Sequence, residues 1–92
     1  MIVPESRMQR AVDALRELGA RRVLLFGSFL EAPERANDVD LAVEGIPLNR
    51  IIDAVVAVED ILEVRTDLVS REENPKFFDF VAGYARVLYE QS

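Results

Sequence analysis

The sequence predicts a small α/β (α+β) domain in which helices pack mainly on one face of a mixed β-sheet of three to four strands. Three observations lead to this fold class. Residues 4–18 carry apolar side chains at helical spacing. Residues 23–26 and 38–43 are short, largely apolar runs of the kind that form buried strands. Residues 62–69 place apolar side chains on one face and polar ones on the other. We expect a single domain, 1–92, with one small core.

Composition indicates a folded, cytoplasmic protein. Half of the 92 residues are hydrophobic and 30% are charged, which is typical of a globular chain rather than a disordered one. No run approaches the ~18 to 20 apolar residues that span a bilayer, and the N-terminus lacks a signal-peptide pattern. We therefore expect no membrane partner.

The absence of two residue types restricts the chemistry. The chain has no cysteine and no histidine, which excludes a disulfide framework, a thiolate zinc site and an imidazole base. Catalysis would have to use carboxylates, hydroxyls, arginine and bound metal. The net charge of −6 argues against direct binding of a nucleic-acid backbone. A nucleotide delivered with Mg²⁺ remains compatible with it, because the metal offsets charge on both sides.

The first half of the chain has clear boundary signals. Pro4 suits the first turn of the initial helix, and Gly19 ends it. The run 23–26 is so short and so apolar that we expect a central strand. Residues 29–32 can then form a short helix that ends at Pro33.

Residues 48–60 are predicted to form a helix with little polar surface. Such a helix is either deeply buried or covered by a partner, and a domain of this size has little depth in which to bury it. Its β-branched residues leave a strand as an alternative.

The C-terminal part is rich in aromatic residues. Asn74 and Pro75 favour the start of a helix that runs to Gly83. Residues 86–89 then form either an edge strand or the continuation of one helix to Tyr89. Five of the seven aromatic residues lie between residues 77 and 89, an enrichment that is typical of protein interfaces.

Two aspartates on one strand suggest a metal site. Asp38 and Asp40 are two residues apart, so they share a face of the strand 38–43. They lie ~7 Å apart along the pleat, where like charges are best tolerated with a cation between them or with a proton retained. Mg²⁺ suits such oxygen ligands and leaves positions for substrate phosphates.

Further residues could complete this site. Gly27 and Ser28 follow the strand 23–26, where free backbone N–H groups and the serine hydroxyl can cradle a phosphate. If the more apolar face of the strand 62–69 packs on the helices, Asp67 points to the same open face as the other two aspartates. Arg65 shares that face and could assist a phosphate or pair with the carboxylates.

These residues carry a resemblance. An apolar strand, Gly27-Ser28, a spacer of residues 29–37 and Asp38-x-Asp40 within a second strand resemble the DNA polymerase beta superfamily, and in so short a chain the minimal nucleotidyltransferases (MNT proteins). The resemblance implies the nucleotidyltransferase fold. It also implies two Mg²⁺ ions bridged by the aspartate pair, with Asp67 as third ligand and proton acceptor, and ATP as substrate.

The resemblance further implies a partner. Minimal members are typically antitoxins paired with a HEPN-domain toxin, which they inactivate by transferring AMP to a tyrosine or by binding it. The helix 48–60 and the aromatic C-terminus would be docking surfaces. A small-molecule nucleotidyltransferase of the antibiotic-modifying kind is a weaker alternative, because the chain lacks a second lobe.

The chain also departs from the family pattern. Minimal members commonly follow Gly-Ser with an arginine and soon a second glycine, whereas Phe29, Leu30 and Glu31 stand here. The spacer is one residue shorter than the commonest form. The alternative is therefore a catalytically weak or inactive module that neutralises or scaffolds a partner by binding alone.

Overall fold

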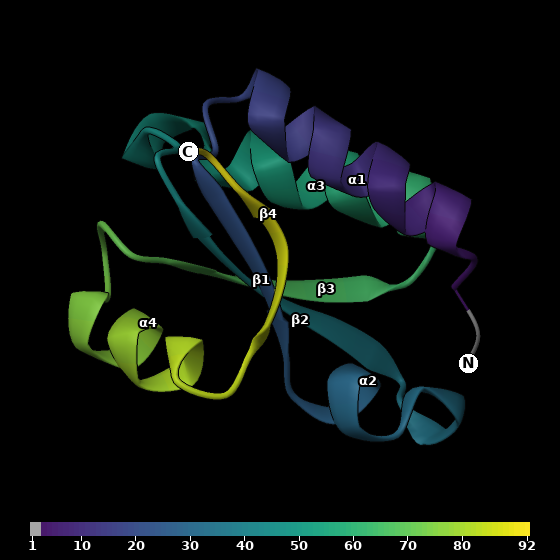
Figure 1. The fold of residues 1–92 in the computed structure, drawn as a ribbon. Coiled ribbons are helices and arrows are strands. Elements are labelled where there is room, and N and C mark those ends of the chain that lie inside the picture. The colour runs from purple at the N-terminus through teal and green to yellow at the C-terminus, as the bar shows by residue number, and fades with distance from the viewer. Residues whose placement is uncertain (1–2) are drawn as a thin grey trace.

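The computed structural model describes residues 3–92, and its helices and strands follow one another in the order shown in Figure 1. The helices are α1 (Glu5–Glu17), α2 (Ser28–Glu31), α3 (Ile51–Leu62) and α4 (Pro75–Ala82), with 3-10 turns at Pro33–Arg35 and Leu48–Arg50. The strands are β1 (Arg22–Phe26), β2 (Asp38–Glu44), β3 (Arg65–Ser70) and β4 (Arg86–Glu90).

The four strands form one mixed sheet in the order β3-β2-β1-β4. β1 pairs antiparallel with both β2 and β4, whereas β2 and β3 are parallel and are joined by the crossover helix α3. The predicted mixed sheet is confirmed, and so is the central position of the first strand. The alternation of faces along β2 and β3 then decides which side chains meet on each side of the sheet.

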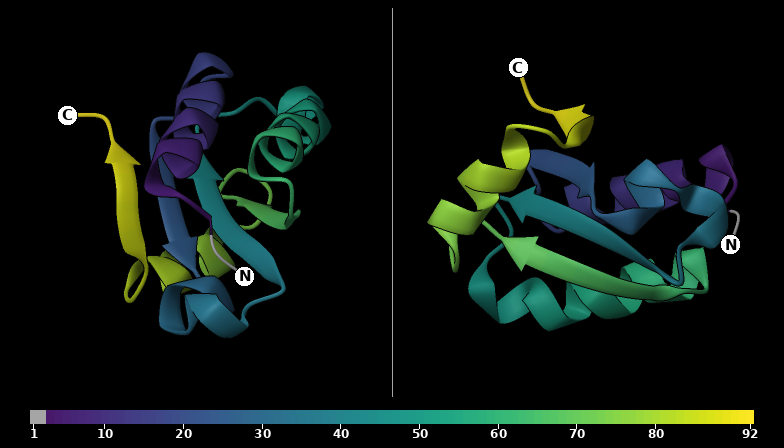
Figure 2. Two further views of the ribbon diagram at one scale, coloured as in Figure 1. Left: turned by 90° about the vertical axis from the view of Figure 1, so that its right-hand side faces the viewer. Right: turned by 90° about the horizontal axis from the view of Figure 1, so that it is seen from below.

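Helices α1 and α3 cover one face of the sheet (Figures 1 and 2). Their buried side chains Leu15, Val58 and Leu62 belong to one hydrophobic cluster with Val39 and Leu41 of β2. These are alternate residues of the strand, so the side chains between them must face the other way. The prediction that helices pack mainly on one face is confirmed for the two longest helices.

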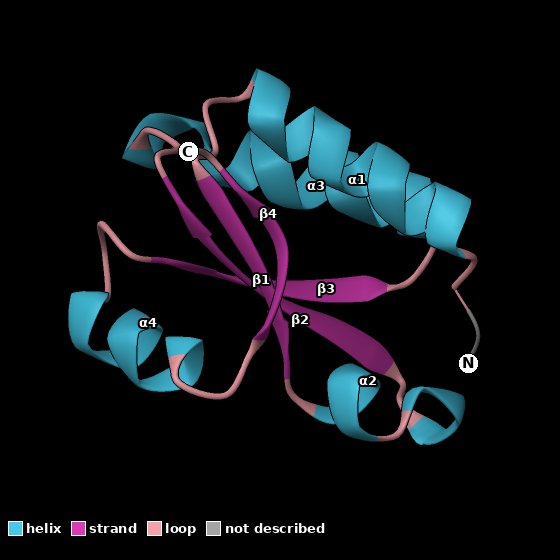
Figure 3. Ribbon diagram, in the orientation of Figure 1, coloured by secondary structure: helices cyan, strands magenta, loops and turns pink. Residues whose placement is uncertain are grey.

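The shorter helix α4 lies on the opposite face, and α2 lies at the end of β1 (Figure 3). The buried residues Phe78 and Val81 of α4 form a second cluster with Leu24, Phe26 and Ala42. The face that carries Asp38 and Asp40 is therefore covered by α4 around Ala42 and is open nearer the start of β2.

One predicted boundary is wrong and two alternatives are settled. The third strand begins at residue 65 rather than 62, because α3 continues to Leu62 and is ended by Glu63 in the left-handed conformation (φ 58°). The strand alternative for residues 48–60 is wrong, since residues 51–60 lie within α3, behind a 3-10 turn. At the C-terminus the helix ends at Ala82, and the edge strand β4 replaces the alternative of one continuous helix.

Helix α3 is buried on one side only. Ala54, Val58 and Leu62 are buried, whereas Ile52 and Val56 are 78% and 52% exposed. A domain this small cannot enclose a helix that is apolar on most sides, so part of its surface faces water. Within residues 3–92, no helix combines the length and the apolar character that crossing a membrane requires.

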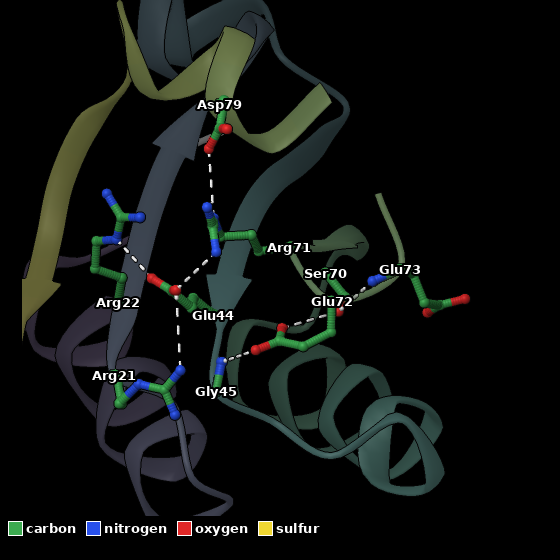
Figure 4. Close-up of polar contacts among 9 residues, drawn as sticks. All are labelled: Arg21, Arg22, Glu44, Gly45, Ser70, Arg71, Glu72, Glu73 and Asp79. Atoms are coloured by element: carbon green, nitrogen blue, oxygen red, sulfur yellow. Dashed lines mark hydrogen bonds and ion pairs between the residues drawn. The ribbon is translucent and has the colours of Figure 1, made fainter. Parts of the chain in front are cut away.

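A charged cluster at the end of β2 fixes the position of α4 (Figure 4). The half-buried Glu44 lies 2.9 Å from Arg22, 3.3 Å from Arg71 and 3.9 Å from Arg21. Arg71 also pairs with Asp79 of α4 at 3.4 Å. Strands β1, β2 and β3 are thereby linked to α4, which is held at a defined place on the sheet.

Candidate functional site

The structure brings the three predicted aspartates together. The register of the parallel strands places Asp40 opposite Asp67 and Asp38 opposite Arg65. Neighbouring strands are ~4.8 Å apart, so the carboxyl groups of Asp40 and Asp67 project side by side. The intervening residues Val39 and Thr66 are buried on the other face. All three aspartates therefore lie on the face opposite α1 and α3.

The three carboxyl groups interact electrostatically. Partial burial raises the pKa of Asp40, and the negative charges of Asp38 and Asp67 raise it further. The interaction of the Asp40 carboxyl group with that of Asp67 acts in the same direction on the pKa of Asp40. The folded chain thus favours the presence of a proton, or of another cation, at this point.

Gly27 lies directly against Asp40. Its backbone has φ 77° and ψ −158°, a region that is essentially restricted to glycine. A Cβ added at Gly27 would overlap Oδ2 of Asp40 and would lie 2.9 Å from its Cγ. Glycine is therefore needed here both for the turn and for the close approach of the backbone to the carboxyl group.

Ser28 begins helix α2 immediately after this turn. The first N–H groups of a helix have no partner inside it, and the exposed Ser28 hydroxyl lies beside them. Glu31 and Ala32 donate their N–H groups to the carbonyls of Gly27 and Ser28. The helix has only four residues, so its dipole is small.

The departure from the family pattern after Ser28 has a structural counterpart. Phe29 and Leu30, at the positions where minimal members commonly place an arginine and soon a glycine, are partly buried against the cluster below α1 and α3. These side chains stabilise the packing of α2. They contribute no positive charge to the aspartate site.

Arg65 is the predicted cation nearest to the aspartates. Its guanidinium lies 3.8 Å from Oδ1 of Asp67, and its side chain is 76% exposed. An ion pair this exposed contributes little to stability. Arg65 remains free to rotate toward a ligand, because β3 holds only its backbone.

The donor set suits a hard divalent cation in chemistry, although its side chains are not arranged as a closed metal cage. Among residues 3–92 no three acidic side chains stand in a ready-made ligand geometry. Asp67 instead pairs with Arg65. Carboxylate oxygens are nevertheless the ligands that Mg²⁺ prefers, and three carboxyl groups share this face of the sheet.

The aspartate site is an open surface. A cavity of about 460 Å³ lies elsewhere, between α1, Phe29 and β4, and its walls include Val12 and Leu25 on the α1 face of the sheet. Asp67 has a half-exposed side chain. A ligand of the aspartates would therefore lie across the sheet surface rather than inside a closed pocket.

The aromatic residue Phe26 borders the site and was not among the predicted site residues. Phe26 lies opposite Asp40 in the register of β1 and β2, and its ring meets that of Phe77 edge to face with 6.0 Å between centroids. The sequence indicated Phe77 only as part of an aromatic C-terminal surface. The contact of Phe77 with Phe26 depends on how α4 packs on the sheet, and the sequence does not predict that packing.

Comparisons with known proteins identify the fold. No family model and no curated protein matches the chain. A solved structure described as a "putative minimal nucleotidyltransferase" is 29% identical, with a TM-score of 0.74 over 88% of each chain. A second, described as a "toxin-antitoxin with AMP-PNP", is 18% identical, with a TM-score of 0.75 over 98% of this chain and 76% of that one.

These similarities confirm the predicted resemblance at the level of the fold. The chain has a nucleotidyltransferase fold of the minimal, MNT type.

Proposed function

We propose that this protein is a Mg²⁺-dependent nucleotidyltransferase that transfers AMP from ATP to a tyrosine hydroxyl of a HEPN-domain toxin, and so acts as its antitoxin. The observation that carries the proposal is the meeting of Asp38, Asp40 and Asp67 on one sheet face beside the Gly27-Ser28 turn. A divalent cation relieves the repulsion among these carboxylates, and the phosphates of a nucleoside triphosphate need such a cation as well. The minimal-nucleotidyltransferase fold supports the same reaction class.

Each residue of the candidate site would have a defined role. Asp38 and Asp40 would hold the metal ions, and Gly27 would let the phosphates approach the backbone. Ser28 would donate its hydroxyl to a terminal phosphate oxygen. Bound metal would supply charge neutralisation at the triphosphate and at the attacking oxygen. Arg65 would turn from Asp67 toward a phosphate.

The transfer itself is a single displacement at phosphorus. The tyrosine oxygen forms a bond to the α-phosphorus of ATP, and the bond from that phosphorus to the bridging oxygen of the β-phosphate breaks. Pyrophosphate leaves with the electron pair. Asp67 takes the hydroxyl proton, a role that suits a half-exposed carboxylate beside the metal-binding pair.

In this proposal the acceptor tyrosine belongs to another protein. The toxin-antitoxin neighbour solved with AMP-PNP supports both a partner and a nucleotide for this fold. Helix α3 offers an exposed apolar surface at Ile52 and Val56, on the far side of the sheet from the aspartates. Exposed apolar patches of this kind are typical of protein-binding surfaces.

Transfer of label tests the proposal. The protein is incubated with α-labelled ATP, Mg²⁺ and a HEPN-domain toxin encoded beside it, and we expect label on a toxin tyrosine. The variant Asp38→Asn with Asp40→Asn should lose the transfer. Asp60→Asn, which changes an exposed carboxylate of α3, is the matched control and should retain it. If the double variant labels the toxin as well as the unaltered protein does, the aspartates are not the catalytic groups.

A binding-only antitoxin is the second candidate, and two observations favour it. No three acidic side chains among residues 3–92 stand in a ready-made ligand geometry, and the position of Phe29 supplies no cation. A protein of this kind would neutralise the toxin without ATP. Equal protection by the unaltered protein and by the double aspartate variant, with no label transferred, would establish this alternative.

A further inference from the structure

Exposed aromatic rings are concentrated on one short helix beside the aspartates. Phe77 and Phe80 of α4 are 41% and 68% exposed, and Tyr84, just after the helix, is 52% exposed. Phe80 and Tyr84 pack edge to face with 5.7 Å between ring centroids. Apolar rings in water forgo the free energy of burial, and exposed patches of this kind are typical of binding sites.

The ring of Phe77 lies against that of Phe26, which is the cross-strand partner of Asp40. Phe26 is buried, lies opposite Asp40 across β1 and β2, and supports Phe77 edge to face at 6.0 Å. Phe77, Phe26 and Asp40 therefore follow one another across α4, β1 and β2.

The position of Phe77 is fixed by the packing of α4. Phe78, the next residue, is fully buried, and the guanidinium of Arg22 lies 4.9 Å from the centroid of its ring. Asp79 is tied to Arg71 at the end of β3. The helix therefore cannot rotate without breaking these contacts, and they keep the partly exposed ring of Phe77 against Phe26.

We infer that Phe77 is the nucleobase platform of this protein, on which the base of the nucleoside triphosphate stacks while its phosphates lie at Asp38, Asp40 and Gly27-Ser28. This inference rests on the proposed nucleotide binding and adds to it the residue that holds the base. Phe80 and Tyr84 form the outer, more exposed part of the same aromatic surface. Stacking on an aromatic ring uses the π-face that every base has. Different purine nucleoside triphosphates should therefore bind with similar affinity.

Comparison of ATP with inorganic triphosphate tests the platform, because the two share phosphates and only ATP carries a base. Both are titrated into the full chain by calorimetry with Mg²⁺. We expect ATP to bind about tenfold more tightly than triphosphate, equivalent to ~1.4 kcal/mol. Phe77→Leu should remove most of this preference and leave the affinity for triphosphate unchanged. Phe77→Trp should keep the preference.

Phe80→Leu is the matched control, since it makes the same change on the same helix at a ring that contacts Tyr84 instead of Phe26. It should retain the preference for ATP. Unaltered preference in Phe77→Leu overturns the inference, and so does an equal loss in Phe77→Leu and Phe80→Leu. If the unaltered protein binds triphosphate and ATP with equal affinity, the phosphate site is supported and the nucleobase platform is refuted. If it binds neither, the proposed nucleotide binding fails and the platform falls with it.

Discussion

Gly27→Ala should be among the most damaging single substitutions in the open face of the sheet. Two separate costs are visible in the structure. The backbone at Gly27 has φ 77° and ψ −158°, which costs a residue with a Cβ ~1–3 kcal/mol. The new methyl group would also overlap Oδ2 of Asp40, so this carboxyl group must move. We expect the free energy of unfolding to fall by ~2–3 kcal/mol in total.

Thermal and urea unfolding followed by circular dichroism measure this effect. For a domain of this size, a loss of ~2–3 kcal/mol lowers the melting temperature by ~8–24 °C. Gly83→Ala is the matched control, because Gly83 has φ −69° and a Cβ there would meet only the carbonyl oxygen of Phe80, at 3.4 Å. That variant should be neutral or stabilised by ~0.4–1 kcal/mol.

A double-mutant cycle separates the two costs. In an Asp40→Ala background the carboxyl group is absent, so Gly27→Ala should cost only the backbone strain and therefore less than in the unaltered protein. The difference between the two backgrounds measures the steric contact alone. If Gly27→Ala lies within ~0.5 kcal/mol of the unaltered protein, the close approach of Gly27 to Asp40 is not as described.

Three further predictions concern the charged groups. Because the pKa of Asp40 is raised in the folded state, the folded chain binds its proton more tightly than the unfolded chain, and stability should fall as the pH rises from 3.8 through the raised pKa. Asp40→Asn should therefore stabilise the protein by ~0.5–1 kcal/mol at pH 7 and have no such effect well below pH 3.8. Urea unfolding at the two pH values measures both effects. Equal effects at both pH values would contradict repulsion among the carboxylates. Mg²⁺ at ten times its Kd should raise the free energy of unfolding by ~1.4 kcal/mol, and the melting temperature with it, in the unaltered protein but not in Asp38→Asn; a rise in both would place the cation elsewhere. Glu44→Gln should cost ~1–3 kcal/mol in urea unfolding, because three arginines would face a neutral group, whereas the exposed Glu73→Gln should change stability by less than ~0.5 kcal/mol; equal changes would mean that Glu44 does not hold the cluster together.

Local pattern predicted most of the elements because each carries its own period and boundary signals. The helix that starts after Pro4 and the strand 23–26 were predicted within two residues of their observed bounds. The error at the start of β3 has a local cause. The sequence pattern predicts Leu62 as the first apolar residue of a strand, but it is the last buried residue of α3. Glu63 adopts a left-handed conformation that the local sequence does not predict.

The sequence by itself determined that Asp38 and Asp40 share a strand face, because side chains alternate along any strand, and that a Gly-Ser turn follows the first strand. Only the tertiary structure decided that Asp67 lies in register with Asp40, since the crossover through α3 sets which residues of two parallel strands are opposite. It also placed α4 across the acidic face, with Phe77 at the edge of the site. Periodicity along a chain fixes the direction of neighbouring side chains, whereas the distance between remote segments depends on how the whole core packs.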